Sequence, residues 1–153
     1  MQVTLIILKP SAVQRGILGE VITRFERKGI QIVGMKMVRL TDETLEEHYA
    51  HLLNKPFYGR IKNSMQAGPV VVMALKGVDV VNVVRKLSGV TNGREAEPGT
   101  IRGDYSMSVQ ENVVHASDSP ETAAAELKRF FSDGEIYDDV PHLIPFFYAN
   151  DEL

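Results

Sequence analysis

His115 is the residue whose position best suits nucleophilic chemistry, because it ends a short apolar run and stands just before a helix start. That start is marked by Ser119 as a capping residue, Pro120 at the first helical position and Glu121 at the positive end of the helix dipole. A side chain at such a strand-to-helix junction lies over backbone N–H groups that attract phosphate. Histidine has an unperturbed pKa of about 6.5 and is largely neutral at pH 7, so His115 is a candidate phosphoryl acceptor. The alternative interpretation of the local sequence is a histidine that only caps or packs in a loop.

Five polar side chains could hold a polyphosphate beside that imidazole: Lys9, Arg85, Thr91, Arg94 and Arg102. Arginine forks bind phosphate oxygens in pairs, and a hydroxyl adds a further donor. Each of these residues, taken alone, also fits a solvated charged loop. The sequence contains neither a G-x-x-x-x-G-K-[ST] element nor a kinase-type glycine-rich loop. A nucleoside triphosphate would therefore have to bind without a P-loop.

Protein ligands for a metal ion are not predicted. His48 and His51 stand three residues apart on a predicted helix near Glu47, but the H-E-x-x-H spacing is absent. We interpret both as solvated histidines on a helix face, and His142, between two prolines of the tail, is a weaker candidate still. The chain has no cysteine, which excludes a disulfide framework, a thiolate nucleophile and cysteine-ligated zinc. This composition suits a reducing compartment, and we expect the cytoplasm.

Length and composition predict one globular domain over residues 1–153. With 153 residues, of which 44% are hydrophobic, the chain can bury about 70% of its unfolded surface without disulfides or metals. The longest apolar run, Val70 to Leu75, is far shorter than the ~20 residues of a membrane helix, and the N-terminus has no basic segment or cleavage site. A net charge of −3 disfavours nucleic acid as a partner but permits a local cationic pocket. We therefore expect neither export nor membrane attachment.

The hydrophobic pattern alternates strands and helices along the chain. Strands are predicted at residues 3–8, 30–40, 70–75 and 105–109, and helices at residues 18–25, 42–53, 57–65, 79–87 and 120–131. Thr41 is expected to cap the second helix. Residues 88–104 form a predicted irregular loop. The tail from Ser132, which holds Pro141 and Pro145, is expected to run extended over the surface.

This order of elements predicts the α/β class, as an α+β sandwich in which helices cover a small sheet. A split βαβ, ferredoxin-like core is the first choice of topology. The sequence contains no internal repeat, low-complexity segment or linker. A second domain is therefore not expected.

Four stretches resemble the nucleoside diphosphate kinase family. They are N-V-V-H-A-S-D at residues 112–118, P-G-T-I-R-G-D at residues 98–104, K-P at residues 9–10 and G-P-V-V at residues 68–71. The first matches N-x-x-H-[GA]-S-D, the family's active-site pattern, and the resemblance runs from the first predicted strand to about Tyr148. It implies a ferredoxin-like βαββαβ core with an antiparallel sheet covered by helices.

The resemblance implies an enzyme that transfers the γ-phosphoryl of a nucleoside triphosphate such as ATP to a nucleoside diphosphate. The reaction would follow a ping-pong path through a phosphohistidine at His115, with Mg²⁺ bound mainly through the nucleotide phosphates. Phosphoryl transfer needs chiefly positioning and charge neutralisation, so a few cations, Mg²⁺ and an in-line imidazole would suffice. The resemblance also implies a homo-oligomer, expected to be a hexamer, with a tetramer as second choice.

The resemblance assigns roles residue by residue. Four positions would form the catalytic group: the nucleophile His115, Glu126 as partner of its other ring nitrogen, Ser117 as support for Glu126, and Tyr49 beside the imidazole. Seven would bind the nucleotide: Arg85, Thr91 and Arg102 its phosphates, Lys9 and Asn112 its sugar hydroxyls, Phe57 and Val109 its base. Taken alone, Tyr49 and Phe57 also fit core packing, and Asn112 fits a turn. Apolar contact with the base predicts broad base specificity.

Three positions depart from the family pattern: Ser11-Ala12 where Asp-Gly is frequent, Gln110 where glycine is common, and Gly93 where proline is often found. None of them is assigned to chemistry. Gln110 bears on how closely the backbone approaches the base, and Gly93 bears on the rigidity of the long loop. The competing hypothesis is a ferredoxin-like module that binds a nucleotide as a regulatory ligand and transfers no phosphate.

Overall fold

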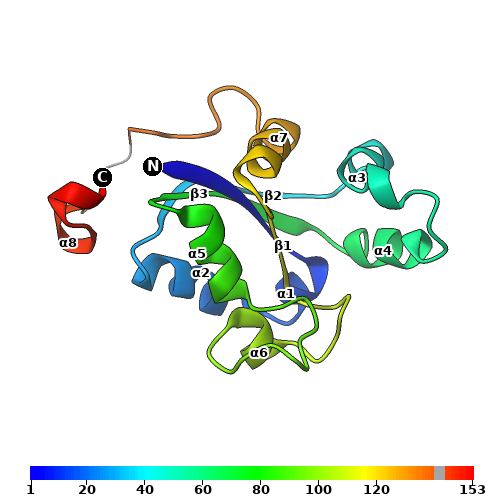
Figure 1. The fold of residues 1–153 in the computed structure, drawn as a ribbon. Coiled ribbons are helices and arrows are strands. Elements are labelled where there is room, and N and C mark those ends of the chain that lie inside the picture. Colours follow the sequence, from blue (N-terminus) through cyan, green and yellow to red (C-terminus); the bar gives the residue numbers. More distant parts are fainter. Residues whose placement is uncertain (140–143) are drawn as a thin grey trace.

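The computed structural model describes residues 1–139 and 144–153. Its described part contains a four-stranded antiparallel sheet in the order β2-β3-β1-β4. The strands are β1 (Gln2–Leu8), β2 (Gln31–Val38), β3 (Val70–Gly77) and β4 (Val114–Ala116). Helices lie on both faces of this sheet, as Figure 1 shows. The predicted α+β sandwich with a ferredoxin-like core is confirmed.

Helices contribute side chains to a hydrophobic core on each face of the sheet. The core on one face includes residues of α2 (Leu18–Arg27) and α5 (Val80–Ser88), and the core on the other includes residues of α3 (Asp42–His48) and α7 (Pro120–Phe130). The remaining helical segments occupy the connections and the tail: α1 (Pro10–Gln14), η1 (Ala50–Leu52), α4 (Tyr58–Met65), α6 (Ile101–Tyr105), α8 (Ile144–Phe147) and η2 (Asn150–Glu152). Within the described ranges, no helix combines the length and the apolar character that crossing a membrane requires.

The central strand β1 is apolar along its length because helices cover both of its faces. Leu5 and Ile7 belong to the core on the α3 and α7 side, whereas Ile6 and Leu8 belong to the core under α2 and α5. All four side chains are fully buried. A strand buried on both faces loses the usual alternation of polar and apolar residues, which explains the continuous apolar run in the sequence.

Side-chain caps fix two of the predicted helix starts. Thr41 Oγ1 accepts from the backbone N–H of Thr44 at 3.2 Å, which begins α3, and Ser119 Oγ accepts from that of Thr122 at 3.0 Å, which begins α7. Both caps were expected from the sequence. Because β4 ends just before Ser119, the cap places His115 of β4 at the junction between strand and helix.

The predicted strand at residues 105–109 is wrong. The helix α6 (Ile101–Tyr105), capped by Thr100, occupies the start of that range. The residues that follow form a loop in which Ser106 bonds to nearby backbone groups, an alternative to sheet pairing that serine often offers. Met107 and Val109 are exposed rather than buried on a common face. The alternating pattern there does not mark a strand, and the fourth strand is β4.

The predicted extended tail is wrong for part of its length. The helical segments α8 and η2 replace the expected extended chain after residue 143. Pro145 does not prevent α8, because it lies in the first turn, where its missing N–H has no helical partner to lose. Tyr148 Oη accepts from the backbone N–H of Val78 at 3.2 Å and ties the tail to the end of the sheet. Pro141 and His142 lie outside the described residues.

Candidate active site

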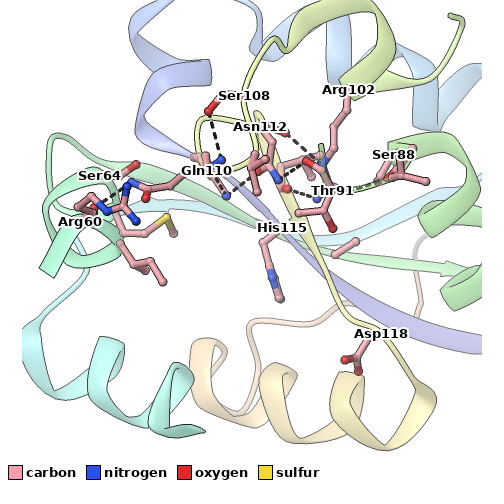
Figure 2. A pocket seen from close by; sticks show the side chains of 18 of the residues that line it. Arg60, Ser64, Ser88, Thr91, Arg102, Ser108, Gln110, Asn112, His115 and Asp118 are labelled. Atoms are coloured by element: carbon pink, nitrogen blue, oxygen red, sulfur yellow. Dashed lines mark hydrogen bonds between the residues drawn. The ribbon is translucent and has the colours of Figure 1, made fainter. Parts of the chain in front are cut away.

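A cleft with a volume of about 940 Å³ separates the α4 side of the molecule from the loop that joins α5 to β4. Figure 2 shows Arg60 and Ser64 on one side of it, Thr91 and Arg102 on the other, and His115 between them. The walls therefore come from segments far apart in the sequence. Their convergence depends on the sheet, since β4 pairs with β1 and carries His115 to the floor of the cleft.

The structure brings nine of the eleven sequence-predicted site residues to this cleft. They are Lys9, Tyr49, Phe57, Arg85, Thr91, Arg102, Val109, Asn112 and His115. Glu126 and Ser117 do not line the wall but lie behind His115, in contact with each other. Arg94 lines the cleft as well, although its Nη1 donates to the carbonyl oxygen of Met107 at 2.8 Å.

His115 is anchored from behind by a buried carboxylate. Its Nε2 lies 2.8 Å from Glu126 Oε2, and Ser117 Oγ donates to Glu126 Oε1 at 2.6 Å. A carboxylate accepts hydrogen bonds, so Nε2 carries the proton and Nδ1 keeps the lone pair. The His115 side chain is 24% exposed, against 5% for Glu126. Nδ1 is therefore the ring nitrogen that a ligand in the cleft can use.

Glu126 stays charged although it is buried. Burial alone raises the pKa of a carboxyl group, but the hydrogen bonds from His115 and Ser117 outweigh it and hold the pKa of Glu126 below its ordinary value. A charged carboxylate on Nε2 stabilises positive charge on the imidazole ring. The pair can therefore support a nucleophilic nitrogen whose ring becomes cationic on reaction.

His48 belongs to this site, which corrects its interpretation as a solvated histidine on a helix face. Its side chain is 2% exposed, and its ring stands edge to face against His115, with ring centres 4.7 Å apart. The sequence holds one signal of this burial, because His48 follows the buried Leu45 by three residues and shares its helix face. His51 is exposed, as expected.

His48 is held as a neutral ring. Burial, followed by repulsion from His115, lowers its pKa to about 3, although Glu126 acts in the opposite direction. Its Nδ1 lies 2.9 Å from Arg129 Nη1 and 3.3 Å from Glu126 Oε2. Besides His48, Arg129 is therefore a second residue near the His115–Glu126 pair, which we call the catalytic dyad, that the sequence did not single out.

Tyr49 is the C-cap of α3, and its ring packs against the His48 ring with ring centres 4.7 Å apart. Burial, followed by repulsion from Glu126, raises the pKa of its phenol to about 12. The phenol is therefore neutral and keeps its O–H. Tyr49 lines the cleft, where its phenol can donate a hydrogen bond.

Lys9 and Asn112 form a polar pair on the cleft wall. Lys9 Nζ donates to Asn112 Oδ1 at 2.6 Å and to the carbonyl oxygen of Gln110 at 3.0 Å. Burial, followed by repulsion from Arg102, lowers the pKa of Lys9 to about 8. The Lys9 amine is still mostly protonated at neutral pH. Its two hydrogen-bond acceptors fix its orientation at the cleft wall.

Arg102 supplies a second partly buried cation. Burial, followed by repulsion from Arg85, lowers its pKa to about 10, which leaves it charged at neutral pH. Its Nη1 donates to the carbonyl oxygen of Gly89 and its Nη2 to that of Val114, both at 2.7 Å. Arg102 thus connects the α5 end of the long loop to β4, while Arg85 enters the cleft from the last turn of α5.

Val113 lies in a backbone conformation that branched residues rarely adopt. Its φ is +74°, and the backbone N–H of Val114 donates to Asn112 O at 2.8 Å across it, which describes a tight γ-turn. Such strain costs on the order of 1–3 kcal/mol and persists where surrounding contacts impose it. Here the Val113 side chain is fully buried, and its carbonyl oxygen accepts from Lys9 N at 2.9 Å. The turn sets Asn112 and His115 on either side of the kink.

Two hydrogen bonds link the loop before Asn112 to α4, and we call them the clasp. Gln110 Nε2 donates to the carbonyl oxygen of Arg60 at 3.0 Å, and Ser64 Oγ donates to Glu111 Oε1 at 2.6 Å. Figure 2 shows Gln110 reaching towards Arg60 at one side of the cleft. The clasp joins the two segments that carry Phe57 and Val109.

One three-residue cluster in the described part of the chain has the spacing to hold a metal ion. Its potential ligand atoms on His48, His115 and Glu126 lie within 4.8 Å of one another. The Arg129 guanidinium, 2.9 Å from His48 Nδ1, opposes a cation at that nitrogen. Hydrogen bonding accounts for this cluster without a metal.

The fold and the cleft define an α+β protein with a cation-lined cleft and an imidazole poised over it. The family model of nucleoside diphosphate kinase matches residues 2–136. A curated relative from Parabacteroides distasonis, a nucleoside diphosphate kinase, is 64% identical over 154 residues and covers 100% of both chains. The chain belongs to the nucleoside diphosphate kinase family and is an enzyme of the phosphotransferase class.

Solved structures agree with this assignment. The nucleoside diphosphate kinase of Halobacterium salinarum, solved in complex with CDP, superposes with a TM-score of 0.93 at 37% identity and covers 97% of this chain and 99% of its own. The apo enzyme from Encephalitozoon cuniculi has a TM-score of 0.91 at 38% identity, with 97% and 100% covered. The resemblance drawn from four sequence stretches is thus confirmed at the level of family and fold.

Proposed function

We propose that this enzyme exchanges the γ-phosphoryl group between nucleoside triphosphates, ATP among them, and nucleoside diphosphates. The path is ping-pong, through a phosphohistidine at His115, and the base specificity is broad. The observation that carries the proposal is the 2.8 Å contact between His115 Nε2 and Glu126 Oε2. It leaves Nδ1 as the free nucleophile in a cleft whose walls carry several cations.

In the first half-reaction the Nδ1 lone pair attacks the γ-phosphorus of the triphosphate. The bond from that phosphorus to the bridging oxygen breaks, and the diphosphate leaves with the electron pair. In the second half-reaction a terminal oxygen of another diphosphate attacks the phosphorus, and the N–P electron pair returns to Nδ1. Glu126 stabilises the ring while it carries positive charge, and Ser117 holds Glu126 in place.

The cations of the cleft hold the phosphates in line with His115. Arg85, Arg102 and the Thr91 hydroxyl contact phosphate oxygens, because these side chains present N–H and O–H donors to the cleft. Lys9 and Asn112, already paired with each other, meet the sugar hydroxyls. Tyr49 donates from beside the imidazole. Catalysis then consists mainly of positioning and charge neutralisation.

The cleft fits Mg²⁺ carried by the nucleotide better than a protein-bound ion. Among the cleft-lining residues, Asp118 supplies the one carboxylate, so most ligands of such an ion are phosphate oxygens and water. Bound in this way, Mg²⁺ would neutralise negative charge on the phosphates. Asp118 is the residue of this chain that would help to hold it.

Base specificity is broad because the two residues assigned to the base, Phe57 and Val109, are apolar. Phe57 and Val109 enclose the base by stacking and packing, which favours no particular pattern of donors and acceptors. The Halobacterium salinarum relative was solved with CDP, a pyrimidine nucleotide, and we infer that this cleft accepts one as well.

The whole chain, residues 1–153, acts as one domain, since Tyr148 Oη ties the tail beyond the matched residues 2–136 back to Val78. The active form is a homo-oligomer; a hexamer is the first choice and a tetramer the second.

Nucleic acid is not expected as a partner because the net charge of the chain is −3. The expected compartment is the cytoplasm, since a chain without cysteine suits a reducing environment.

Labelling with γ-³²P-ATP tests the proposal. The enzyme should take up acid-labile label on His115 and lose it when unlabelled nucleoside diphosphate is added. Purine and pyrimidine diphosphates should both release the label. A protein that binds ADP but never becomes labelled would instead be a regulatory nucleotide-binding module, and the proposed transfer would be wrong.

A further inference from the structure

Arg129 contacts His48 beside the His115–Glu126 pair and does not line the cleft. It lies one turn after Glu126 on α7, and 16% of its side chain is exposed. Its Nη1 donates to His48 Nδ1 at 2.9 Å, while its Nε lies 3.3 Å from Glu47 Oε1. Phosphoryl transfer as described above makes no use of this largely buried cation.

The contact fixes which nitrogen of His48 carries the proton. A guanidinium only donates hydrogen bonds, so His48 Nδ1 must accept, and the neutral ring bears its proton on Nε2. In the other tautomer, an Nδ1–H would face Glu126 Oε2, which is 3.3 Å away. That same oxygen is the partner of His115 Nε2 at 2.8 Å. Two imidazoles would then compete for one carboxylate oxygen.

We propose that Arg129 is a positioning residue that keeps His48 Nδ1 an acceptor and thereby reserves Glu126 Oε2 for His115. Without the guanidinium, His48 is free to carry a proton on Nδ1 and to donate it to Oε2. His115 then loses part of the contact that orients its ring and part of the charge that stabilises the ring during transfer. The loss grows towards acid pH, where His48 takes up a proton more readily.

Charged and titratable groups face His48 from four places: His115 on β4, Glu126 and Arg129 on α7, His51 on η1, and Tyr49 at the end of α3, whose phenol is neutral. Burial, with repulsion from three of these groups, outweighs attraction by Glu126 and lowers the pKa of His48 to about 3. Removing Arg129 takes away one repelling cation and the donor to Nδ1, so the pKa of His48 should rise. The other charges near His115 belong to the cleft lining: Lys9, Arg60, Arg85, Arg94, Arg102 and Asp118.

Histidine NMR of the nucleotide-free enzyme tests this role without reference to activity. The ring nitrogens of His48 should report a neutral Nε2–H tautomer at pH 5 and above. In Arg129→Gln, whose amide is a neutral donor, the His48 titration should move to higher pH by at least about one unit. Arg129→Lys keeps the cation and should restore most of the wild-type behaviour. Lys128→Gln removes the same charge from the exposed side of α7 and should leave His48 unchanged.

The pH dependence of kcat/KM gives a second readout. The loss of kcat/KM in Arg129→Gln should be larger at pH 5.5 than at pH 8, because a raised pKa increases the protonated share of His48 only towards acid pH. A purely structural defect would lower activity by the same factor at both pH values. In a Glu126→Gln background, Arg129→Gln should add no further acid-side loss, since it acts through that carboxylate.

The kinetic arm rests on the proposed function, whereas the NMR arm does not. If the wild type forms no phosphohistidine while His48 still titrates higher in Arg129→Gln, the proposed function fails and the positioning role stands. An unchanged His48 titration in Arg129→Gln, or an equal shift in Lys128→Gln, overturns the role. If Arg129→Gln does not fold, Arg129→Lys provides the test, because it keeps the positive charge. A His48 that titrates near its ordinary pKa in Arg129→Lys would refute the proposal.

Discussion

Two histidines in contact use their ring nitrogens in opposite ways, and the neighbours decide which. A carboxylate meets His115 Nε2 and makes it a donor, whereas a guanidinium meets His48 Nδ1 and makes it an acceptor. The first arrangement leaves a lone pair facing the cleft. The second keeps a buried ring neutral beside it. The reactivity of His115 therefore depends on partners from α3 and α7 as well as on its own position.

Replacing His115 tests its proposed role as the nucleophile. His115→Asn should fold and bind ADP, because an amide fits the site and the cleft cations remain, but it should form no acid-labile phosphoenzyme. Phosphate exchange should fall to background. Labelling and a coupled exchange assay measure both, with His51→Asn, at an exposed histidine, as the matched control. Normal labelling of His115→Asn would show that another residue accepts the phosphoryl group.

Replacing Glu126 separates charge from geometry. Glu126→Ala should lower kcat/KM by about 10- to 100-fold, by analogy with partners of metal-bound histidines, and Glu126→Gln should cost less because a carbonyl acceptor remains. A neighbouring carboxylate favours the protonated imidazole, so both variants should move the acid limb of kcat/KM to lower pH. Arg129→Gln should move it the other way. If kcat/KM and its acid limb are unchanged in both Glu126 variants, the Glu126 carboxylate has no role in the mechanism.

The residues that sequence reasoning found and missed differ in one physical respect. His115 lies in a contiguous signature, so the motif pointed to it and to the helix that carries Glu126. The contact between Arg129 and His48 joins positions 81 residues apart, and no local pattern encodes it. The positive φ of Val113 is equally invisible, because a branched residue there contradicts its own backbone preference.

At the scale of elements, the predictions held where a helix or strand is stabilised by its own pattern. The strand β1 shows an uninterrupted apolar run, and α3 and α7 begin at capping residues. The prediction failed at residues 105–109, where serine side chains satisfy the backbone locally. It also failed in the tail, where α8 is only Ile144–Phe147 and depends on what it packs against.

The clasp predicts a coupling between two elements of the cleft. Gln110→Gly and Ser64→Ala each remove one hydrogen bond between α4 and the loop that carries Val109. A typical hydrogen bond contributes about 0.5–1.5 kcal/mol and both of these are exposed, so KM for a nucleoside diphosphate should rise by about twofold to at most about tenfold while kcat changes little. Steady-state kinetics measure the split. Asn63→Ala, exposed on the same helix and outside the cleft lining, is the control, and an equal effect there would dismiss the clasp.

At the scale of the whole molecule, exposed apolar side chains favour self-association. Met35 and Met37 on the edge strand β2 are 54% and 55% exposed, and Phe146 of α8 is 80% exposed. Exposed apolar side chains on an edge strand usually mark a surface that another chain or segment covers. Light scattering at micromolar concentration should give a mass several-fold above the 17.0 kDa of one chain, with six subunits preferred over four. A monomer under those conditions would contradict both assemblies.

The buried His48 makes the stability of the fold depend on pH in a defined window. Its pKa is lowered from 6.5 to about 3, chiefly by burial. Between these values the unfolded chain binds a proton at this residue and the folded chain does not, so acidification favours unfolding. The free energy of unfolding should thus be flat above the unfolded pKa and fall below it, by at most about 1.4 kcal/mol per pH unit from this group. Glu126, with its lowered pKa, loses its contribution only at lower pH, as the pH falls from the ordinary carboxyl value of 4.5 towards its folded pKa.

Urea unfolding at pH 7 and pH 5 isolates this effect, because carboxyl groups remain ionised in that interval. His48→Gln is the informative variant, since its amide oxygen can accept from Arg129 and does not titrate. The wild type should lose about 1–2 kcal/mol more than His48→Gln on going from pH 7 to pH 5. Subunit concentration is held fixed, because association contributes to apparent stability. His51→Gln, at the exposed histidine, should follow the wild type. If instead the wild type and His48→Gln lose the same free energy, His48 is protonated in the folded protein, and the neutral acceptor that Arg129 requires does not exist.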